Sequence, residues 1–149
     1  MTELLHFEDF HAGQIYDLST HVLTVEEILD FAREFDPQPQ HLDPDAAKEL
    51  LGGLAASGWH LCALAMRMIV DGLFNRATSL CAPGVEEVQW RRPVRAGDCL
   101  KLDCEVLETR LSSKPDRGFV RFRFSMWRSE ERVMVFACSV MFGRRGESV

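Results

Sequence analysis

The segment 57–72 constrains the fold most, because it is apolar on nearly every side over the length of a substantial helix. Its only charged residues are Arg67 and Asp71. A helix without a polar face belongs in the interior of a protein, so other parts of the chain must wrap around it. With 149 residues, the chain is long enough to bury one such helix in one core. We therefore expect a single domain, residues 1–149, built around this helix.

The second half of the chain changes to the period of a β-strand. Apolar and polar residues alternate over 100–106 and again over 120–126. Residues 133–142 are apolar apart from Ser139, as in a strand inside a sheet, and 85–92 is a weaker strand pattern ahead of Pro93. A polar connection over 112–118 fits an antiparallel meander. A buried helix followed by strands that curve around it predicts an α+β fold.

Two shorter helices are expected before the central one. Thr24 stands three residues before Glu27, which is the spacing of a capping box, and apolar residues then recur at helical spacing up to Phe35. Asp43 and Pro44 have the pattern of a cap followed by a first-turn proline, so a second helix should cover 44–51. Gly52 and Gly53 should end it.

The run 35–44 carries the candidate chemistry, because Asp36 and His41 lie five residues apart within it. Pro37 and Pro39 disfavour helix in the residues before them, so we expect a stiff, irregular loop that holds both side chains on one target. An acid and an imidazole in such a loop form a candidate acid/base pair. The alternative interpretation is that Asp36 only ends the preceding helix and His41 lies on the surface.

Composition argues against several other classes of protein. A net charge of −6 does not suit a general nucleic-acid binder, and no apolar run is long enough to span a bilayer. The first residues are acidic rather than basic, so we expect no export and a cytoplasmic location. Five cysteines without a Cys-x-x-Cys pair indicate free thiols, and the five histidines lack the spacing of zinc ligands, so no metal is expected.

Three stretches together resemble the MaoC-like dehydratases of the hydratase-2 type. They are Phe-Asp-Pro-Gln-Pro-Gln-His-Leu-Asp-Pro at 35–44, Gly-Gly-Leu-Ala-Ala-Ser-Gly-Trp-His at 52–60 and Arg-Pro-Val-Arg-Ala-Gly-Asp at 92–98. The resemblance extends over nearly the whole chain. It implies a hot-dog fold, in which an antiparallel sheet wraps a long central helix, and acyl thioesters of coenzyme A as substrates.

The resemblance also implies roles for individual residues. The family motif Asp-x-Asn-Pro-x-His corresponds to Asp36 and His41, with Gln38 in place of Asn and Gln40 in place of an apolar residue. The family's oxyanion donor, a backbone N–H at the start of the central helix, corresponds to Gly58. Family members often have His at the preceding position, where this chain has Ser57, a natural helix N-cap. We expect Gln38, Gln40, Ser57 and Trp59 to contact substrate, although an apolar helix such as 57–72 is more often plain core.

The implied reaction is reversible addition of water to a 2-enoyl-CoA, giving a 3-hydroxyacyl-CoA of R configuration. No cofactor is expected beyond the coenzyme A of the substrate, and the protein should form a homodimer or a dimer of dimers. A hot-dog thioesterase is a weaker alternative, because such an enzyme more typically places its acid on or beside the central helix, where the only acid here is Asp71 near the far end. A second alternative is a module that binds acyl-CoA without catalysis. Candidate partners for the coenzyme A phosphates are Arg91, Arg92, Arg95, Lys114, Arg117, Arg144 and Arg145.

Overall fold

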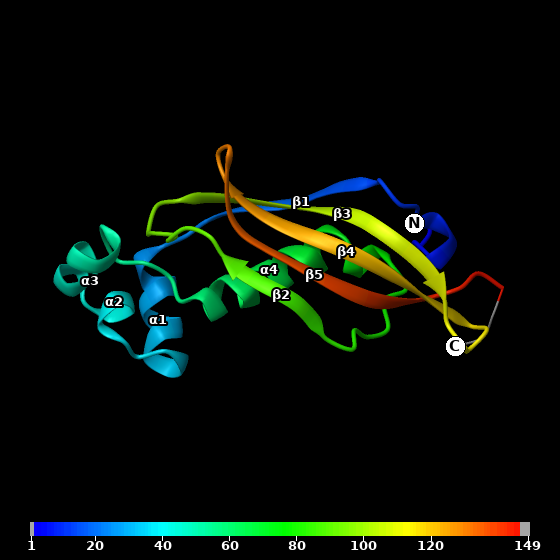
Figure 1. Ribbon diagram of the computed structural model, residues 1–149, viewed down its shortest axis with the longest axis horizontal. Helices are drawn as coiled ribbons and strands as arrows, with labels where there is room; N and C mark the ends of the chain where they lie inside the picture. Colours follow the sequence, from blue (N-terminus) through cyan, green and yellow to red (C-terminus); the bar gives the residue numbers. More distant parts are fainter. Residues whose placement is uncertain (1, 147–149) are drawn as a thin grey trace.

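The computed structural model describes residues 2–146 and contains one antiparallel sheet that curves over a long helix (Figure 1). The strands follow one another in the order β1-β3-β4-β5-β2, so β1 and β2 form the two edges. Each pair of neighbours is antiparallel. The strands are β1 (Ile15–Val22), β2 (Val85–Trp90), β3 (Cys99–Leu111), β4 (Arg117–Arg128) and β5 (Glu131–Gly143).

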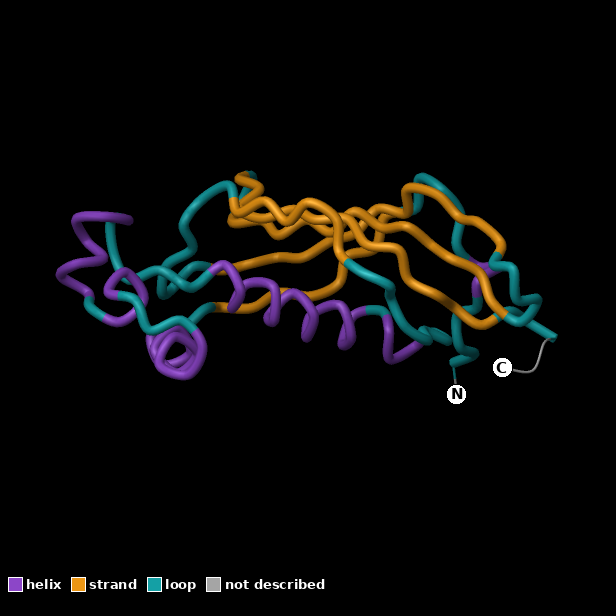
Figure 2. Tube along the Cα trace, turned by 60° about the horizontal axis from the view of Figure 1, so that its bottom comes forward, coloured by secondary structure: helices purple, strands orange, loops and turns teal. Residues whose placement is uncertain are grey.

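The central helix α4 (Gly58–Gly72) lies along the inner face of the sheet, as Figure 2 shows from the side. Its buried side chains, such as Leu61, Ala65 and Ile69, join one core with the inward residues of the strands. Gly72 permits this close packing, because a Cβ there would lie 2.4 Å from the carbonyl oxygen of Leu18. The expected antiparallel sheet over a long central helix is therefore confirmed, but the helix is not buried all round, because Trp59 and Met66 are 64% and 45% exposed.

The remaining helices gather at one end of the sheet (Figure 1). They are α1 (Val25–Phe35), α2 (Pro39–Leu42) and α3 (Pro44–Leu51). The predicted caps are present: Thr24 Oγ1 accepts from the Glu27 N–H at 3.2 Å, and Asp43 Oδ1 accepts from the Asp45 N–H at 3.0 Å. Gly52 ends α3 at a φ of 75°, a left-handed conformation that glycine adopts without strain. Short 3-10 helices, η1 (Phe7–Asp9) and η2 (Phe74–Arg76), follow the N-terminus and α4.

Two features differ from the sequence-based expectations. The loop 36–44 is not irregular throughout, because one helical turn, α2, begins at Pro39. A first-turn proline has the φ of a helix and lacks only an N–H that would be unpaired there, so Pro39 starts a turn rather than preventing one. The edge strand β1 was not predicted from the sequence. Only Leu18 of this strand is buried, so its residues do not alternate between apolar and polar.

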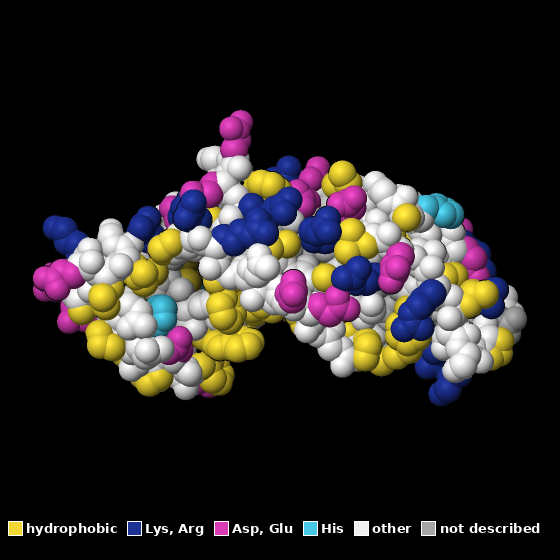
Figure 3. Space-filling view, viewed as in Figure 1, with side chains coloured by type: hydrophobic (Ala, Val, Ile, Leu, Met, Phe, Trp, Pro, Cys, Tyr) yellow, Lys and Arg dark blue, Asp and Glu magenta, His cyan; other side chains and the backbone are white. Residues whose placement is uncertain are grey.

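All five cysteines are free thiols. Within residues 2–146, no helix has both the length and the apolar content needed to cross a membrane. Lys and Arg side chains gather over the middle of the outer face of the sheet, which faces the viewer in Figure 3.

Candidate functional site

Asp36 and His41 lie side by side where α1 passes into α2. Asp36 is the residue that follows α1, and His41 lies in the single turn of α2. The Nε2 atom of His41 is 3.3 Å from Oδ2 of Asp36, and the two side chains are only 10% and 18% exposed. The proline-containing loop thus brings together the two residues that its spacing had singled out.

The other ring nitrogen of His41 is held by a backbone carbonyl. Nδ1 lies 2.7 Å from the oxygen of Ala55, in the segment before α4. A carbonyl can only accept, so Nδ1 carries the hydrogen of this bond. In a neutral imidazole, Nε2 then has a lone pair, and it faces the Asp36 carboxylate. Two acceptors at this distance can share one water molecule that donates a hydrogen to each.

Asp36 is held in its charged form by polar neighbours. The hydroxyl of Ser57 and the amide of Gln38 lower the pKa of Asp36 below its ordinary value, and His41 adds to them only when its ring is protonated, whereas partial burial acts in the opposite direction. The Gln38 amide donates to Asp36 Oδ1 at 2.6 Å. The Gln40 amide donates in turn to Gln38 Oε1 at 3.3 Å. The two glutamines therefore form a chain that ends on the carboxylate.

The start of α4 lies next to this pair. Ser57 is the N-cap residue and is buried, yet within the described chain its hydroxyl has no hydrogen bond of ordinary geometry. The hydroxyl is close enough to Asp36 to affect its pKa, but it does not cap the helix as expected. The backbone N–H of Gly58 belongs to the first turn, where helical N–H groups have no partner within the helix.

Gly58 is also where α4 meets the edge strand β2. A Cβ at Gly58 would lie 2.5 Å from Cε2 of Trp90, so only glycine lets the indole approach this closely. Trp90 in turn makes an edge-to-face contact with Trp59, with ring centroids 5.3 Å apart. Sequence analysis missed Trp90, for which the only signal was its place at the end of a weak strand pattern.

Two hollows flank these tryptophans. One, of about 240 Å³, lies beside the start of α4 and is lined by Gly58, Trp90, Arg91 and Arg92 among others. The second, also about 240 Å³, is almost wholly apolar and lies between α4 and strands β2, β4 and β5. Trp59 lines this apolar hollow while remaining 64% exposed. Its other lining residues include Cys62, Met66, Ile69, Phe124 and Phe136.

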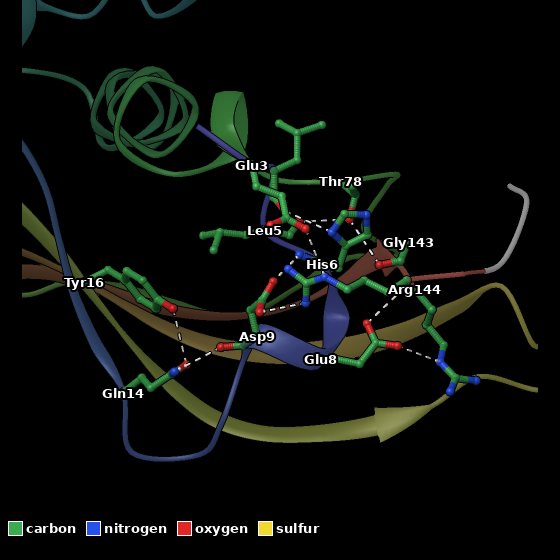
Figure 4. Close-up of polar contacts among 12 residues, drawn as sticks. Glu3, Leu5, His6, Glu8, Asp9, Gln14, Tyr16, Thr78, Gly143 and Arg144 are labelled. Atoms are coloured by element: carbon green, nitrogen blue, oxygen red, sulfur yellow. Dashed lines mark hydrogen bonds and ion pairs between the residues drawn. The ribbon is translucent and has the colours of Figure 1, made fainter. Parts of the chain in front are cut away.

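The candidate phosphate-binding residues do not gather in one place. Arg91 and Arg92 lie beside the Gly58 hollow, whereas Arg95 donates to the Leu51 carbonyl at 2.7 Å. Arg144 and Arg145 bind Glu8, Asp9 and Glu3 and so tie the last strand to the N-terminal segment, where Figure 4 shows Arg144 directed at Glu8. Arg117 pairs with its neighbour Asp116 at 2.8 Å, and Lys114 lies in the connection between β3 and β4.

The carbonyl of Ala55 is a second functional group that sequence analysis missed. A backbone oxygen has no residue-specific signal, and Ala55 is fourteen residues from His41.

The residues 2–146 contain no group of three or more His, Cys, Asp or Glu side chains that could hold a metal ion.

Comparisons with known proteins give the arrangement a family. The model of the MaoC like domain matches residues 9–127. A crystal structure of a MaoC-like dehydratase from Rhodospirillum rubrum is similar at 37% identity, with a TM-score of 0.88 over 96% of this chain and 99% of that one. R-hydratase PhaJ1 from Pseudomonas aeruginosa shares the fold at 22% identity, with a TM-score of 0.72 over 98% and 94% of the two chains.

The uncharacterized protein YdeM of Bacillus subtilis is similar along most of its length, with 26% identity over 133 residues that cover 89% of this chain and 93% of that protein. A Mycobacterium tuberculosis protein with a double hotdog fold matches with a TM-score of 0.78 at 20% identity, which agrees with the hot-dog architecture of sheet and central helix seen here. The family model covers most of the chain, and the Rhodospirillum dehydratase aligns almost end to end. The chain therefore belongs to the MaoC-like domain family and has a hot-dog fold.

Proposed function

We propose that the protein is a hydratase that adds water reversibly to a 2-enoyl-CoA thioester and gives the (R)-3-hydroxyacyl-CoA. The observation that carries this proposal is the pair of Asp36 Oδ2 and His41 Nε2, 3.3 Å apart in a mostly buried setting. Membership of a family that includes dehydratases supports the reaction class. The acyl substrate and the individual roles below are our inference.

In the proposed reaction, Asp36 and His41 hold one water molecule by accepting its two hydrogens. The water oxygen forms the bond to C3 of the enoyl group, one of its protons passes to the pair, and the pair returns one proton to C2. The enzyme therefore gains no net proton over the cycle. The lowered pKa of Asp36 keeps the carboxylate charged and able to accept at neutral pH.

Negative charge that develops on the thioester oxygen needs a donor, and we assign this role to the backbone N–H of Gly58. The N–H lies at the N-terminal end of α4, where the helix dipole also favours negative charge. A preorganised oxyanion donor of this kind contributes about 10²- to 10³-fold in rate. Ser57 and Gln38 act on Asp36, while Gln40 supports Gln38. Trp59 and the apolar hollow that it lines would receive the acyl chain.

The test is the ultraviolet absorbance of the conjugated enoyl thioester in a panel of short, medium, branched and carboxylated 2-enoyl-CoAs. We expect wild-type protein to remove the absorbance without releasing thiol. The Asp36→Asn variant should lose about 10²- to 10⁴-fold in rate, because its amide cannot accept a proton. Asp30→Asn is the matched control, since Asp30 lies on α1 with its side chain 78% exposed.

Each other outcome has a definite meaning. Equal rates for wild type and Asp36→Asn would refute the role of the pair. Release of thiol would indicate a thioesterase instead. Binding of the thioesters without either change would indicate a non-catalytic acyl-CoA-binding module.

We further propose that two chains pair through the edge strand β2. One side of β2 has no neighbouring strand in the sheet order, and an open edge readily pairs with another strand. Exposed apolar side chains lie on and beside it, with Val85 57%, Trp90 44% and Met66 45% exposed. A mass near 17.0 kDa by light scattering, the mass of one chain, would contradict this pairing.

A further inference from the structure

The side chain of Arg95 is directed at the backbone beside the candidate site. It is half-buried, and its Nε donates to the carbonyl of Leu51, the last residue of α3, at 2.7 Å. The last carbonyls of a helix have no partner within the helix, and an arginine is well suited to bind them. Arg95 therefore fixes the end of α3 from outside the helix.

The guanidinium of Arg95 also covers the turn that follows α3. Gly52 and Gly53 form this turn, and both have a positive φ. A Cβ at Gly52 would lie 3.0 Å from Nη2 of Arg95, and a Cβ at Gly53 would lie 3.4 Å from its Cδ. Two successive glycines have no side chains of their own that could fix a turn. The side chain of Arg95 packs against them in place of such side chains.

The backbone of Arg95 holds the other end of the same segment. Arg95 and Ala55 face each other in an isolated antiparallel bridge. The hydrogen bond of this bridge joins flanking residues, from the Ala56 N–H to the Val94 carbonyl at 2.8 Å. In such a pair, the two opposed residues direct their own N–H and C=O groups away from each other. The carbonyl of Ala55 is therefore turned toward α2, where it accepts from His41 Nδ1 at 2.7 Å.

The loop that carries Arg95 is fixed to the sheet. Asp98 Oδ2 accepts from the Arg95 N–H at 2.9 Å and from Nη1 of Arg128 at 2.8 Å. Arg128 is the last residue of β4, and the same Nη1 donates to the Pro93 carbonyl at 2.8 Å. The side chains of Asp98 and Arg128 are mostly buried. The Arg95 side chain thus extends from a backbone position that β4 holds in place.

We propose that Arg95 is a positioning residue that orients His41 through residues 51–55. This inference rests on the proposed function, in which Nε2 of His41 accepts a hydrogen of the reacting water. The Ala55 carbonyl selects the tautomer of His41 that has its hydrogen on Nδ1. Arg95 holds that carbonyl from both ends of the segment, with its side chain at Leu51 and its backbone at Ala55. Without the guanidinium, the glycine turn moves, and Nε2 carries the hydrogen in a fraction of the molecules.

The kinetic test is Arg95→Met, which keeps an unbranched side chain but cannot donate to Leu51. For a 2-enoyl-CoA, kcat should fall about 10- to 100-fold, the effect of a displaced catalytic group. KM should stay within about twofold, because Arg95 does not contact substrate in this proposal. Arg95→Lys should recover most of kcat, since its ammonium can donate to the same carbonyl. Arg76→Met is the matched control, because Arg76 Nε donates to the Gly72 carbonyl at the far end of α4, at 3.2 Å.

A spectroscopic test reads the tautomer of His41 without turnover. In protein labelled with ¹⁵N at histidine, the nitrogen chemical shifts at alkaline pH distinguish a neutral ring with its hydrogen on Nδ1 from one with it on Nε2. The His41→Asn variant identifies the signals of His41. Wild type and Arg76→Met should show the Nδ1–H form alone, whereas Arg95→Met should show both forms. A purely structural role of Arg95 would change stability but not this tautomer.

Three results would overturn the proposal: an unchanged kcat in Arg95→Met, an unchanged His41 tautomer in that variant, or a higher KM for the CoA thioester at constant kcat. The last result would indicate that Arg95 binds a substrate phosphate. Loss of folding in Arg95→Met, seen by circular dichroism, would also overturn it, because Arg95 would then support the fold as a whole. If wild-type protein turned over no enoyl thioester, only the proposed function would fail, and the His41 tautomer would still decide the role of Arg95.

Discussion

The contact between Gly58 and Trp90 gives a prediction whose size follows from the geometry. In Gly58→Ala, the new methyl group would lie 2.5 Å from Cε2 and 2.6 Å from Cδ2 of the indole. Both distances are far below an ordinary carbon–carbon contact, so Trp90 or the start of α4 must move. Overpacking of this kind costs about 1–3 kcal/mol in free energy of unfolding. The helix-propensity gain of alanine does not offset this cost, because Gly58 is the first residue of α4 rather than an interior one.

The measurement is a double-mutant cycle with Trp90→Ala, using urea unfolding followed by circular dichroism. We expect Gly58→Ala to destabilise the wild-type background by about 1–3 kcal/mol and the Trp90→Ala background by less than about 0.5 kcal/mol. All four proteins must be compared at one concentration, because dimerisation would couple stability to concentration.

The same variants report on the proposed oxyanion donor. In the wild-type background, Gly58→Ala should lower hydratase kcat, because a displaced first turn misdirects the Gly58 N–H. The Trp90→Ala background should recover part of that loss. An equal destabilisation by Gly58→Ala in both backgrounds would refute the reasoning, since the cost would then not come from the indole.

Two further predictions concern pH. In Gln38→Leu, the carboxylate of Asp36 loses the amide that donates to it at 2.6 Å, so the pKa of Asp36 should rise. The acid limb of the pH–rate profile should then move to higher pH. An acid limb that does not move would contradict the contact between Gln38 and Asp36. Burial lowers the pKa of His60, which stacks on Phe31 at 4.8 Å. The unfolded chain therefore takes up a proton near the usual pKa of 6.5 while the folded chain does not, and stability is lost as pH falls below that value. His60→Phe should lose less free energy of unfolding between pH 7 and 5 than wild type, in urea titrations at each pH; equal losses would show that His60 is not the group responsible.

The sequence predicted correctly those elements in which burial repeats with the period of a helix or of a strand. α4 buries one face, with residues such as Leu61, Ala65 and Ile69, and β3, β4 and β5 place alternate residues in the core, so their periodicity was visible. Sequence reasoning failed for β1, where only Leu18 is buried. It also failed for α2, because the rule that proline disfavours helix does not apply to the first turn.

The candidate site, too, was predicted only in part from the sequence. Asp36 and His41 are close in the chain, and a motif of fixed spacing could identify them. Their partners come from other elements: the carbonyl that orients His41 belongs to Ala55, and the indole that covers Gly58 belongs to Trp90. No local pattern encodes such contacts, since they form only when the helices pack against the edge of the sheet.

These cross-element contacts explain how the proposed acid/base pair and the proposed oxyanion donor keep a fixed separation. The N–H of Ala55 donates to the Gln40 carbonyl at 3.4 Å while its own carbonyl binds His41, so the α2 turn is held from both sides. Ala56 donates to the Val94 carbonyl at 2.8 Å, which ties the same segment to the chain beyond β2. Gly58 follows two residues later. The backbone of residues 55–58 therefore links the pair and the donor directly, and a change that loosens this segment should affect catalysis before it affects the core.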